Sequence, residues 1–428
     1  MPIAYDATRL FLGPLSWTPR GIDRVDLEYA RHVFTQSDDD CYAILPTIWG
    51  IRCFPRERVL RGLPRLEELW SETIAPEEDR AWLHLKARLQ GHANQSIHRR
   101  PSRSPLVLAA RMTSLLKATG IGLGHSAVAT LPRGTAYLNI GQIGLSMPFL
   151  LRWLDRRPDI RSIFMLHDVI PLETPEYVEP SAVTGHAAMV EQTARRASGL
   201  VVTTQAARAA VQAQLEKRGA GQLATLALPL PVQDIFRRPA SPEPDLADIS
   251  YFVVCGAIEH RKNHLLLMEV WRRLARRLGP QTPHLVAVGS LGWQGGAIRD
   301  KFERSTDVNR YVHLVSGLST PALHRLIGGA RALLMPSLIE GYGLPIVEAG
   351  AMGTPVIASD ISAHREVASP ATVFVDPLDG PGWEAAILEK LRVGTAFASE
   401  QGFEVLTWPD YFVALGAFID EVKAAAGR

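Results

Sequence analysis

The sequence of 428 residues has few cysteines and no long apolar run. Its three cysteines, Cys41, Cys53 and Cys255, provide neither a disulfide framework nor the C-x-x-C spacing of a metal site. The N-terminus lacks a charged and then apolar leader, and no stretch of about 18 apolar residues occurs. These absences predict no secretion signal and no membrane-spanning helix, and a reduced, cytoplasmic setting is the simplest expectation.

The net charge is only +2, which gives no general case for nucleic acid binding. Acidic residues are nevertheless missing altogether between Asp79 and Asp155. Lysines and arginines alternate with apolar residues over 86–118, and such a segment can lie on an anionic membrane surface or receive a phosphorylated lipid. We therefore expect peripheral contact with the inner face of a membrane through this segment, with a solvated basic loop as the alternative.

The length suits two domains, and strand-like and helical segments alternate along the chain. This alternation predicts doubly wound, Rossmann-like α/β domains. A strand at 3–6, a glycine-containing loop at 11–22 and a helix at 23–34 would open the first domain. Residues 237–248, rich in proline and polar side chains, look like a linker. A strand at 251–255 would open the second domain.

The most informative stretch is 335–360, MPSLIEGYGLPIVEAGAMGTPVIASD. It predicts a buried strand, a glycine-rich loop, a short helix beginning at Pro345 and a further strand. Free N–H groups and the dipole at such a helix start favour a phosphate or diphosphate. Glu340 and Glu348 flank this site, and their carboxylates suit the hydroxyls of a sugar better than they suit a phosphate.

This stretch resembles the E-x7-E signature of retaining glycosyltransferases with the GT-B fold, which include bacterial mannosyl-, glucosyl- and rhamnosyltransferases. The matching positions are Ser337, Glu340, Gly341, Tyr342, Gly343, Leu344, Pro345, Glu348, Ala349, Gly353, Pro355, Val356, Ile357 and Ser359. The resemblance implies that Glu340 positions the donor sugar and that Glu348 binds the ribose hydroxyls. The other donor-binding residues that it implies are Gly21, Gly256, Ser337, Gly341, Tyr342, Gly343 and Leu344.

The strand at 251–255 leads into a second motif, which is similar to the family's G-x-x-E-x-R-K-N segment. The residues that match are Gly256, Glu259, Arg261, Lys262 and Asn263. Arginine offers a bidentate fork and lysine a mobile point charge, and both suit phosphate oxygens. The resemblance implies that Arg261 and Lys262 bind the nucleotide diphosphate, and we expect Asn263 to cap the following helix.

The first domain carries two weaker resemblances. The strand at 160–166 runs into HDVIPL, similar to an H-D-x-I-P-L segment of the family, at the strand end where open α/β sheets bind ligands. This implies that His167 faces the donor sugar, with a loop-capping histidine as the alternative. The loop containing Gly21 and Arg24 looks like a variant of a T-G-I-x-R loop near the donor phosphates or the acceptor. A surface salt bridge is the alternative role for Arg24.

Together these features predict a GT-B fold with two doubly wound domains facing a cleft. The expected parts are an acceptor-side N-terminal domain (1–240), a linker (241–248), a nucleotide-sugar-binding domain (249–407) and a C-terminal helix that crosses back (408–428).

The function that this resemblance implies is retaining, metal-independent transfer of a hexose, with mannose favoured, from a nucleoside diphosphate sugar to a bacterial polysaccharide or lipid-linked glycan. No bound metal or cofactor is expected, and the acidic run 38–40 is interpreted as a solvated turn. Three alternatives remain open. One is a rhamnosyl- or glucosyltransferase, another is a different GT-B enzyme such as a sugar-nucleotide epimerase, and the third is a catalytically silent sugar-nucleotide-binding subunit.

Overall fold

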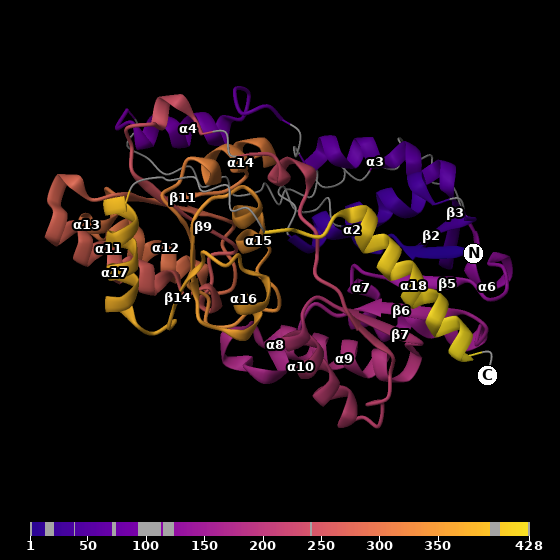
Figure 1. Ribbon diagram of the computed structural model, residues 1–428. Helices are drawn as coiled ribbons and strands as arrows, with labels where there is room; N and C mark the ends of the chain where they lie inside the picture. The colour runs from indigo at the N-terminus through magenta and orange to yellow at the C-terminus, as the bar shows by residue number, and fades with distance from the viewer. Residues whose placement is uncertain are drawn as a thin grey trace.

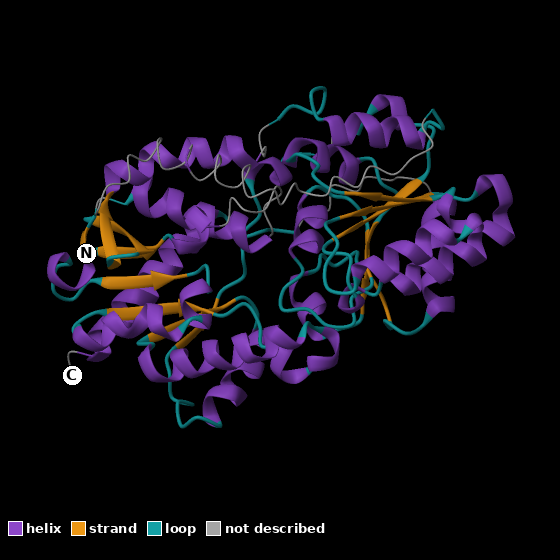
Figure 2. Ribbon diagram, turned by 180° about the vertical axis from the view of Figure 1, so that it is seen from behind, coloured by secondary structure: helices purple, strands orange, loops and turns teal. Residues whose placement is uncertain are grey.

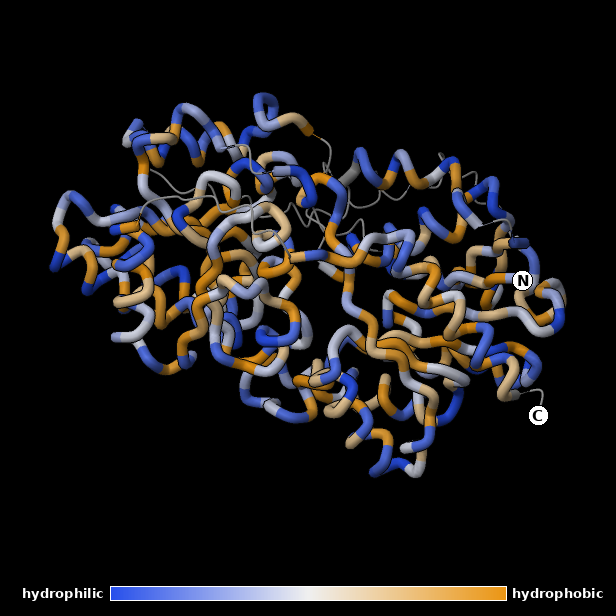
Figure 3. The backbone as a smooth tube through the Cα atoms, in the orientation of Figure 1, coloured by the Kyte–Doolittle hydropathy of each residue, from blue (hydrophilic) through white to orange (hydrophobic). Residues whose placement is uncertain are grey.

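A computed structural model describes residues 2–12, 21–37, 39–70, 74–92, 113, 124–239, 242–393 and 403–426. The chain forms two α/β halves, each built around its own sheet (Figures 1 and 2). The strands themselves are largely apolar, while the outer helices mix polar and apolar residues (Figure 3). The predicted α/β architecture of two doubly wound units is therefore confirmed.

The N-terminal sheet has eight strands in the order β4-β3-β2-β1-β5-β6-β7-β8. Their bounds are β1 Ile3–Asp6, β2 Cys41–Thr47, β3 Gly50–Pro55, β4 His125–Ser126, β5 Ala136–Asn139, β6 Arg161–Met165, β7 Gly199–Val202 and β8 Thr225–Ala227. The pairs β2–β3 and β3–β4 are antiparallel, and the other pairs are parallel. The antiparallel extension was not predicted, because no motif marked residues 50–135.

The C-terminal sheet has six parallel strands in the order β11-β10-β9-β12-β13-β14. Their bounds are β9 Tyr251–Cys255, β10 His284–Val288, β11 Val312–Val315, β12 Leu333–Met335, β13 Val356–Ser359 and β14 Val373–Val375. The order reverses between β9 and β12, and ligands bind doubly wound sheets at the carboxyl ends of strands beside such a switch point. The loops after these two strands are therefore where a ligand site is expected.

Helices cover both faces of the two sheets (Figure 2). In the N-terminal half they are α1 Thr8–Leu12, α2 Gly21–Arg31, α3 Arg56–Trp70, α4 Arg80–Leu89, α6 Ala127–Thr130, α7 Ile143–Ser146, α8 Ile170–Glu173, α9 Pro180–Arg196 and α10 Gln205–Glu216. After β9 they are α11 His264–Leu278, α12 Gly295–Arg304, α13 Thr306–Asn309, α14 Thr320–Gly328, α15 Leu344–Ala351, α16 Ser362–Val367, α17 Gly380–Val393 and α18 Trp408–Ala426.

The last helix, α18, returns to the N-terminal half, as Figure 1 shows in yellow. The Tyr411 hydroxyl lies 2.5 Å from the Tyr29 hydroxyl of α2, and Phe418 and Val422 pack near Gly199 of β7. One continuous buried apolar cluster also joins the two sheets, with Leu138 of β5 at one side and Ile346 of α15 at the other. Apolar burial therefore holds the two halves together in this arrangement.

Helix α4 does not follow the predicted division at residue 240, because it lies against the C-terminal half beside β11 and α14 (Figure 1). Its N-cap residue Asp79 accepts a hydrogen bond of 2.7 Å from the backbone N–H of Ser319. Lys86 donates to Asp245 over 2.8 Å, while burial lowers the pKa of Arg88. Both described cations of the basic segment 86–118 thus face protein. The rest of that segment, apart from residues 87–92 and 113, lies outside the described residues.

The predicted linker is packed where the structure describes it, over residues 242–248. Leu246 is buried in a short 3₁₀ turn, Pro244–Leu246. Glu243 is buried as well and pairs with Lys86 and Arg325. This connection is therefore fixed by side-chain contacts, and the exact domain boundaries remain a prediction. Within the described ranges, no helix has both the length and the apolar character needed to cross a membrane.

Candidate active site

The first part of the site follows β9. Gly256 has φ +143°, and a Cβ there would lie 3.1 Å from the Lys262 side chain, so glycine lets this chain turn close to that lysine. Asn263 also has a positive φ of +54°, and its side-chain amide donates 2.8 Å to the Pro377 carbonyl. It makes no capping hydrogen bond to α11, so the predicted capping role of its side chain is wrong.

Glu340, in the loop after β12, brings the two sequence motifs together. Arg261 donates to its Oε2 over 2.7 Å, Lys262 donates to Oε1, and the Ser337 hydroxyl donates 2.8 Å to the same Oε1. Arg261 also donates to the Glu259 carboxylate over 2.9 Å. Five predicted or matched positions thus form one cluster at the carboxyl ends of neighbouring strands.

Charge keeps this cluster ionised even though it is buried. Burial alone would raise the pKa of Glu340, but Arg261 and Lys262 outweigh it and hold that pKa well below its usual range. Burial lowers the pKa of Lys262, while Glu340 opposes that shift. The carboxylate therefore fixes both cations in place, where they border the loop that leads into α15.

That loop, 341–343, reaches the N-terminal half. The Gly341 carbonyl accepts hydrogen bonds of 3.2 Å from the hydroxyls of both Thr203 and Thr204. A Cβ on Gly341 would lie 2.8 Å from the His167 carbonyl oxygen and 2.8 Å from the Asp168 Cβ. Since real Cβ atoms do not approach so closely, only glycine fits at this contact between the two halves.

Two further glycine-loop residues lie where the halves meet. The Tyr342 side chain is 9% exposed, and its hydroxyl donates 2.6 Å to the Leu230 carbonyl. That side chain therefore secures the interface, and any contact with a donor falls to its backbone. Gly343 has φ +106° and precedes α15, in which Pro345 occupies the first turn, as predicted.

His167 follows β6 in the N-terminal half, at the predicted strand end. Burial and the nearby Arg9 lower the pKa of its ring to about 4, so the ring is neutral at pH 7. The ring makes a hydrogen bond with the Ile140 backbone, but its Nε2 is buried without a partner among the described residues. A buried, unpaired nitrogen is costly unless a ligand or water satisfies it.

Glu348 sits in α15 and pairs across the halves with Arg24 of α2. The Arg24 guanidinium donates 2.9 Å to its Oε1, and the side chains are 16% and 2% exposed. Burial raises the pKa of Glu348, and Arg24 opposes the rise. Three residues before Arg24 in α2, a Cβ added to Gly21 would lie 3.7 Å from the Leu344 side chain. The predicted donor-binding residues Gly21, Leu344 and Glu348 thus gather at the start of α15.

Two contacts were not predicted as parts of the site. His364 of α16 is fully buried, its ring lies 3.3 Å from the position of a Cβ on Gly343, and its Nε2 has no partner among the described residues. Glu366 accepts 2.7 Å hydrogen bonds from the backbone N–H groups of Gln205 and Ala206, at the start of α10. Sequence reasoning did not single out either residue as part of the site, because a cap between the two halves leaves no local sequence signal.

Comparison with known proteins gives matches to the C-terminal half and to the whole chain. Residues 250–396 match the family described as glycosyl transferases group 1. The chain is 28% identical over 239 residues to O-antigen chain mannosyltransferase B of Escherichia coli, covering 54% of this chain and 61% of that protein. The chain thus spans less than two thirds of this relative's length.

Solved structures show the same fold over the whole chain. A sucrose-phosphate synthase from Thermosynechococcus elongatus superposes with a TM-score of 0.61 at 15% identity, covering 99% of this chain and 100% of that one. The Anabaena protein HepE in complex with UDP-glucose gives 0.56 at 15% identity, with coverages of 99% and 98%. The resemblance stated from the motifs is confirmed at the level of the family. Residues 250–396 thus match the group 1 glycosyltransferase family, within a chain that has the GT-B fold throughout.

Proposed function

We propose that this protein is a retaining, metal-independent glycosyltransferase that moves mannose from a nucleoside diphosphate mannose to a bacterial polysaccharide or lipid-linked glycan. The preference for mannose draws on its similarity to an O-antigen chain mannosyltransferase. The nucleotide-sugar donor draws on the group 1 family match over residues 250–396. Attachment to the cytoplasmic face of a membrane, where lipid-linked acceptors are built, remains part of the proposal.

The observation that carries this proposal is the cluster of Glu340, Arg261 and Lys262 beside the start of α15. It combines two partly buried cations, with side-chain exposures of 18% and 13%, with the N-terminus of a helix, which is an arrangement suited to a diphosphate. His167 approaches from the other half, since its backbone contacts Gly341 of the same loop. In the proposal, the groups that bind the diphosphate and the group that binds the sugar would lie on opposite sides of one loop.

In the proposed reaction the bond between the sugar's anomeric carbon and the diphosphate oxygen breaks while an acceptor hydroxyl adds from the same face. The proton of that hydroxyl passes to the departing phosphate oxygen. Arg261, Lys262 and the α15 N-terminus offset the charge that grows on the leaving diphosphate, an effect worth several kcal/mol in comparable sites. Glu340 holds both cations and accepts from a sugar hydroxyl, and neutral His167 hydrogen-bonds the sugar through Nε2.

The test is a panel of GDP-, UDP- and dTDP-sugars, incubated without acceptor, with release of free nucleoside diphosphate as the readout. We expect slow, selective hydrolysis of GDP-mannose that is lost in Glu340→Ala. Selective use of a dTDP- or UDP-sugar would replace mannose with rhamnose or glucose. Nucleotide binding with no turnover, even with a lipid-phosphate acceptor present, would contradict the proposal and indicate a silent binding subunit.

A further inference from the structure

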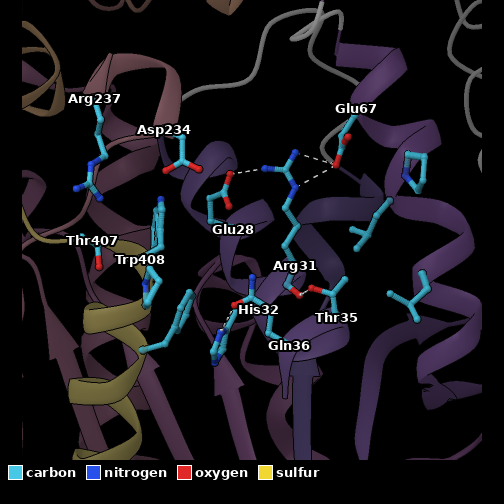
Figure 4. Close-up of a pocket in the computed structure, with 15 residues that line it drawn as sticks. Glu28, Arg31, His32, Thr35, Gln36, Glu67, Asp234, Arg237, Thr407 and Trp408 are labelled. Carbon is cyan, nitrogen blue, oxygen red and sulfur yellow. Dashed lines mark hydrogen bonds and ion pairs between the residues drawn. The ribbon is translucent and has the colours of Figure 1, made fainter. Parts of the chain in front are cut away.

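A cavity lies where α2, α3 and α18 meet. Its volume is about 590 Å³, within the range of small-molecule sites. Figure 4 shows Glu28 and Arg31 of α2 facing Glu67 of α3, with Asp234 and Trp408 beside them. We call this cavity the hinge pocket, because Asp234 and Trp408 each lie next to a segment that joins the two halves of the chain.

The charges of the hinge pocket differ from those of the donor site. Arg31 pairs with Glu28 and, over 2.8 Å, with Glu67, so its charge is already offset. Asp234 and Arg237 line the pocket with no hydrogen-bond or ion-pair partner among the described residues, and both are exposed. Three carboxylates thus face two guanidinium groups, a balance that disfavours a phosphate or nucleotide.

The remaining wall is aromatic. The rings of Trp408 and His32 both stack on Phe412. Their centroids lie 5.5 Å and 3.7 Å from the Phe412 centroid, respectively. Burial lowers the pKa of His32, so this wall adds no positive charge at pH 7. An aromatic surface flanked by carboxylates and guanidinium groups offers both apolar contact and bidentate hydrogen bonds. This combination suits a neutral ligand with many hydroxyl groups.

The position of the pocket connects it with the donor site. Arg24, Glu28 and Arg31 are four and then three residues apart, so they share one face of α2. Arg24 pairs with Glu348 of α15, while Glu28 and Arg31 line the pocket. The 3₁₀ turn Asp234–Arg237 also packs against α15. Glu28, which lines the pocket, therefore lies about one helical turn, roughly 6 Å along α2, from Arg24, which contacts the donor-site helix.

We propose that the hinge pocket binds a neutral saccharide segment of the glycan acceptor, away from its reactive end. The proposal rests on the proposed function for the nature of that glycan. Binding there would hold a growing chain on the enzyme between transfers. It would also contact both segments that connect the halves, at Asp234 and at Thr407–Pro409.

The test measures binding by calorimetry, without turnover, using α-linked mannotetraose as the neutral probe and mannose 6-phosphate as the anionic one. The pocket variant is Asp234→Asn/Arg237→Ala, chosen because neither exposed side chain supports the fold. The matched control is Asp248→Asn/Arg238→Ala, which changes the same residue types at exposed positions that do not line the pocket. Thermal unfolding verifies that both variants are folded.

We expect mannotetraose to bind the wild type and the control equally and the pocket variant about tenfold or more weakly. We also expect mannose 6-phosphate to bind no more tightly than mannose. The proposal would be overturned if mannotetraose bound the pocket variant as tightly as the control, or if it did not bind the wild type. Tighter binding of mannose 6-phosphate than of mannose would also overturn it. Hydrolysis of nucleotide sugars is a separate measurement, so failure of the proposed function and failure of this site are distinguishable.

Discussion

The two halves present different kinds of polar group at the edges where they meet. In the C-terminal half, the Glu340 carboxylate forms ion pairs with both Arg261 and Lys262. In the N-terminal half, His167 is neutral and its buried Nε2 lacks a partner among the described residues. In the first edge, both cations already have an ion-pair partner within the protein. In the second edge, the Nε2 atom of His167 can still form a hydrogen bond with a ligand.

Under the proposed function, the charged groups would serve the diphosphate and the neutral histidine would serve the sugar. Charges that must stabilise a leaving diphosphate gain from being fixed in advance, because they then need no reorganisation during the reaction. A neutral hydrogen-bonding group suits the sugar, whose hydroxyls carry no charge. The contact of Gly341 with the His167 backbone places the two kinds of group on either side of one loop.

The largest expected effect comes from breaking the charged edge. Lys262→Ala should reduce transfer by roughly 10²- to 10³-fold, since one preorganised group that stabilises developing charge is lost. The measurement is kcat with the donor identified from the panel. Lys301→Ala, an exposed lysine of the same half, is the control and should be unaffected. A Lys262→Ala enzyme that retains the wild-type rate would remove this residue from the site.

The contact between the edges can be broken without touching any charge. Gly341→Ala adds a Cβ that would meet the His167 carbonyl oxygen at 2.8 Å, so the two edges must separate. We expect transfer to fall about 10²-fold, because misplacement by about 1 Å is that costly. Gly296→Ala is the matched control, since nothing lies within 4 Å of its added Cβ. Equal rates for the two variants would show that the observed closeness is not needed for activity.

The ion pair between the halves affects stability. Arg24→Ala leaves Glu348 buried and unpaired, and we expect the free energy of unfolding to fall by about 3 kcal/mol. Arg24→Ala/Glu348→Leu should be less destabilised than Arg24→Ala alone, because no buried charge is then left without a partner. Urea denaturation of the wild type and both variants measures this. A double variant that is less stable than the single one would argue against the charge as the cause.

The smallest effect is a pH dependence of stability. Burial lowers the pKa of His264 to about 4 from an ordinary value of 6.5. The unfolded chain therefore binds more protons between those values, and this contribution to the free energy of unfolding is lost as the pH falls from about 6.5 to 4. Asp26, whose pKa burial raises to about 8, acts with the opposite sign. Comparing His264→Leu with the wild type at pH 7 and pH 5 isolates the histidine, and identical pH dependence would contradict the assignment.

The sequence was most predictive where local motifs set local structure. The stretch from β12 to β13 and the R-K-N segment were placed correctly, since strand, glycine loop and helix start are all local features. Contacts between the halves were not predictable in this way. The pairing of Arg24 with Glu348 joins residues 324 positions apart, and the cap that Glu366 gives α10 spans about 160.

In the N-terminal half, the positions of a whole helix and a whole strand could not be predicted from local sequence. Helix α4 lies on the C-terminal half because Asp79 and Lys86 find partners there, at Ser319 and Asp245. Nothing in the periodicity of residues 80–89 distinguishes a helix packed on its own domain from one packed on the other. The strand β3 was missed for a related reason, as its edge position depends on pairing with β2 and not on a motif.

The central claim is that the charged edge binds the diphosphate and the neutral edge serves the sugar. It is tested most directly by measuring GDP affinity and mannose transfer together in Arg261→Ala and His167→Ala. The account predicts that Arg261→Ala loses both GDP affinity and transfer, while His167→Ala binds GDP as the wild type does and loses transfer. Wild-type GDP affinity in Arg261→Ala, or a loss of GDP affinity in His167→Ala, would contradict it.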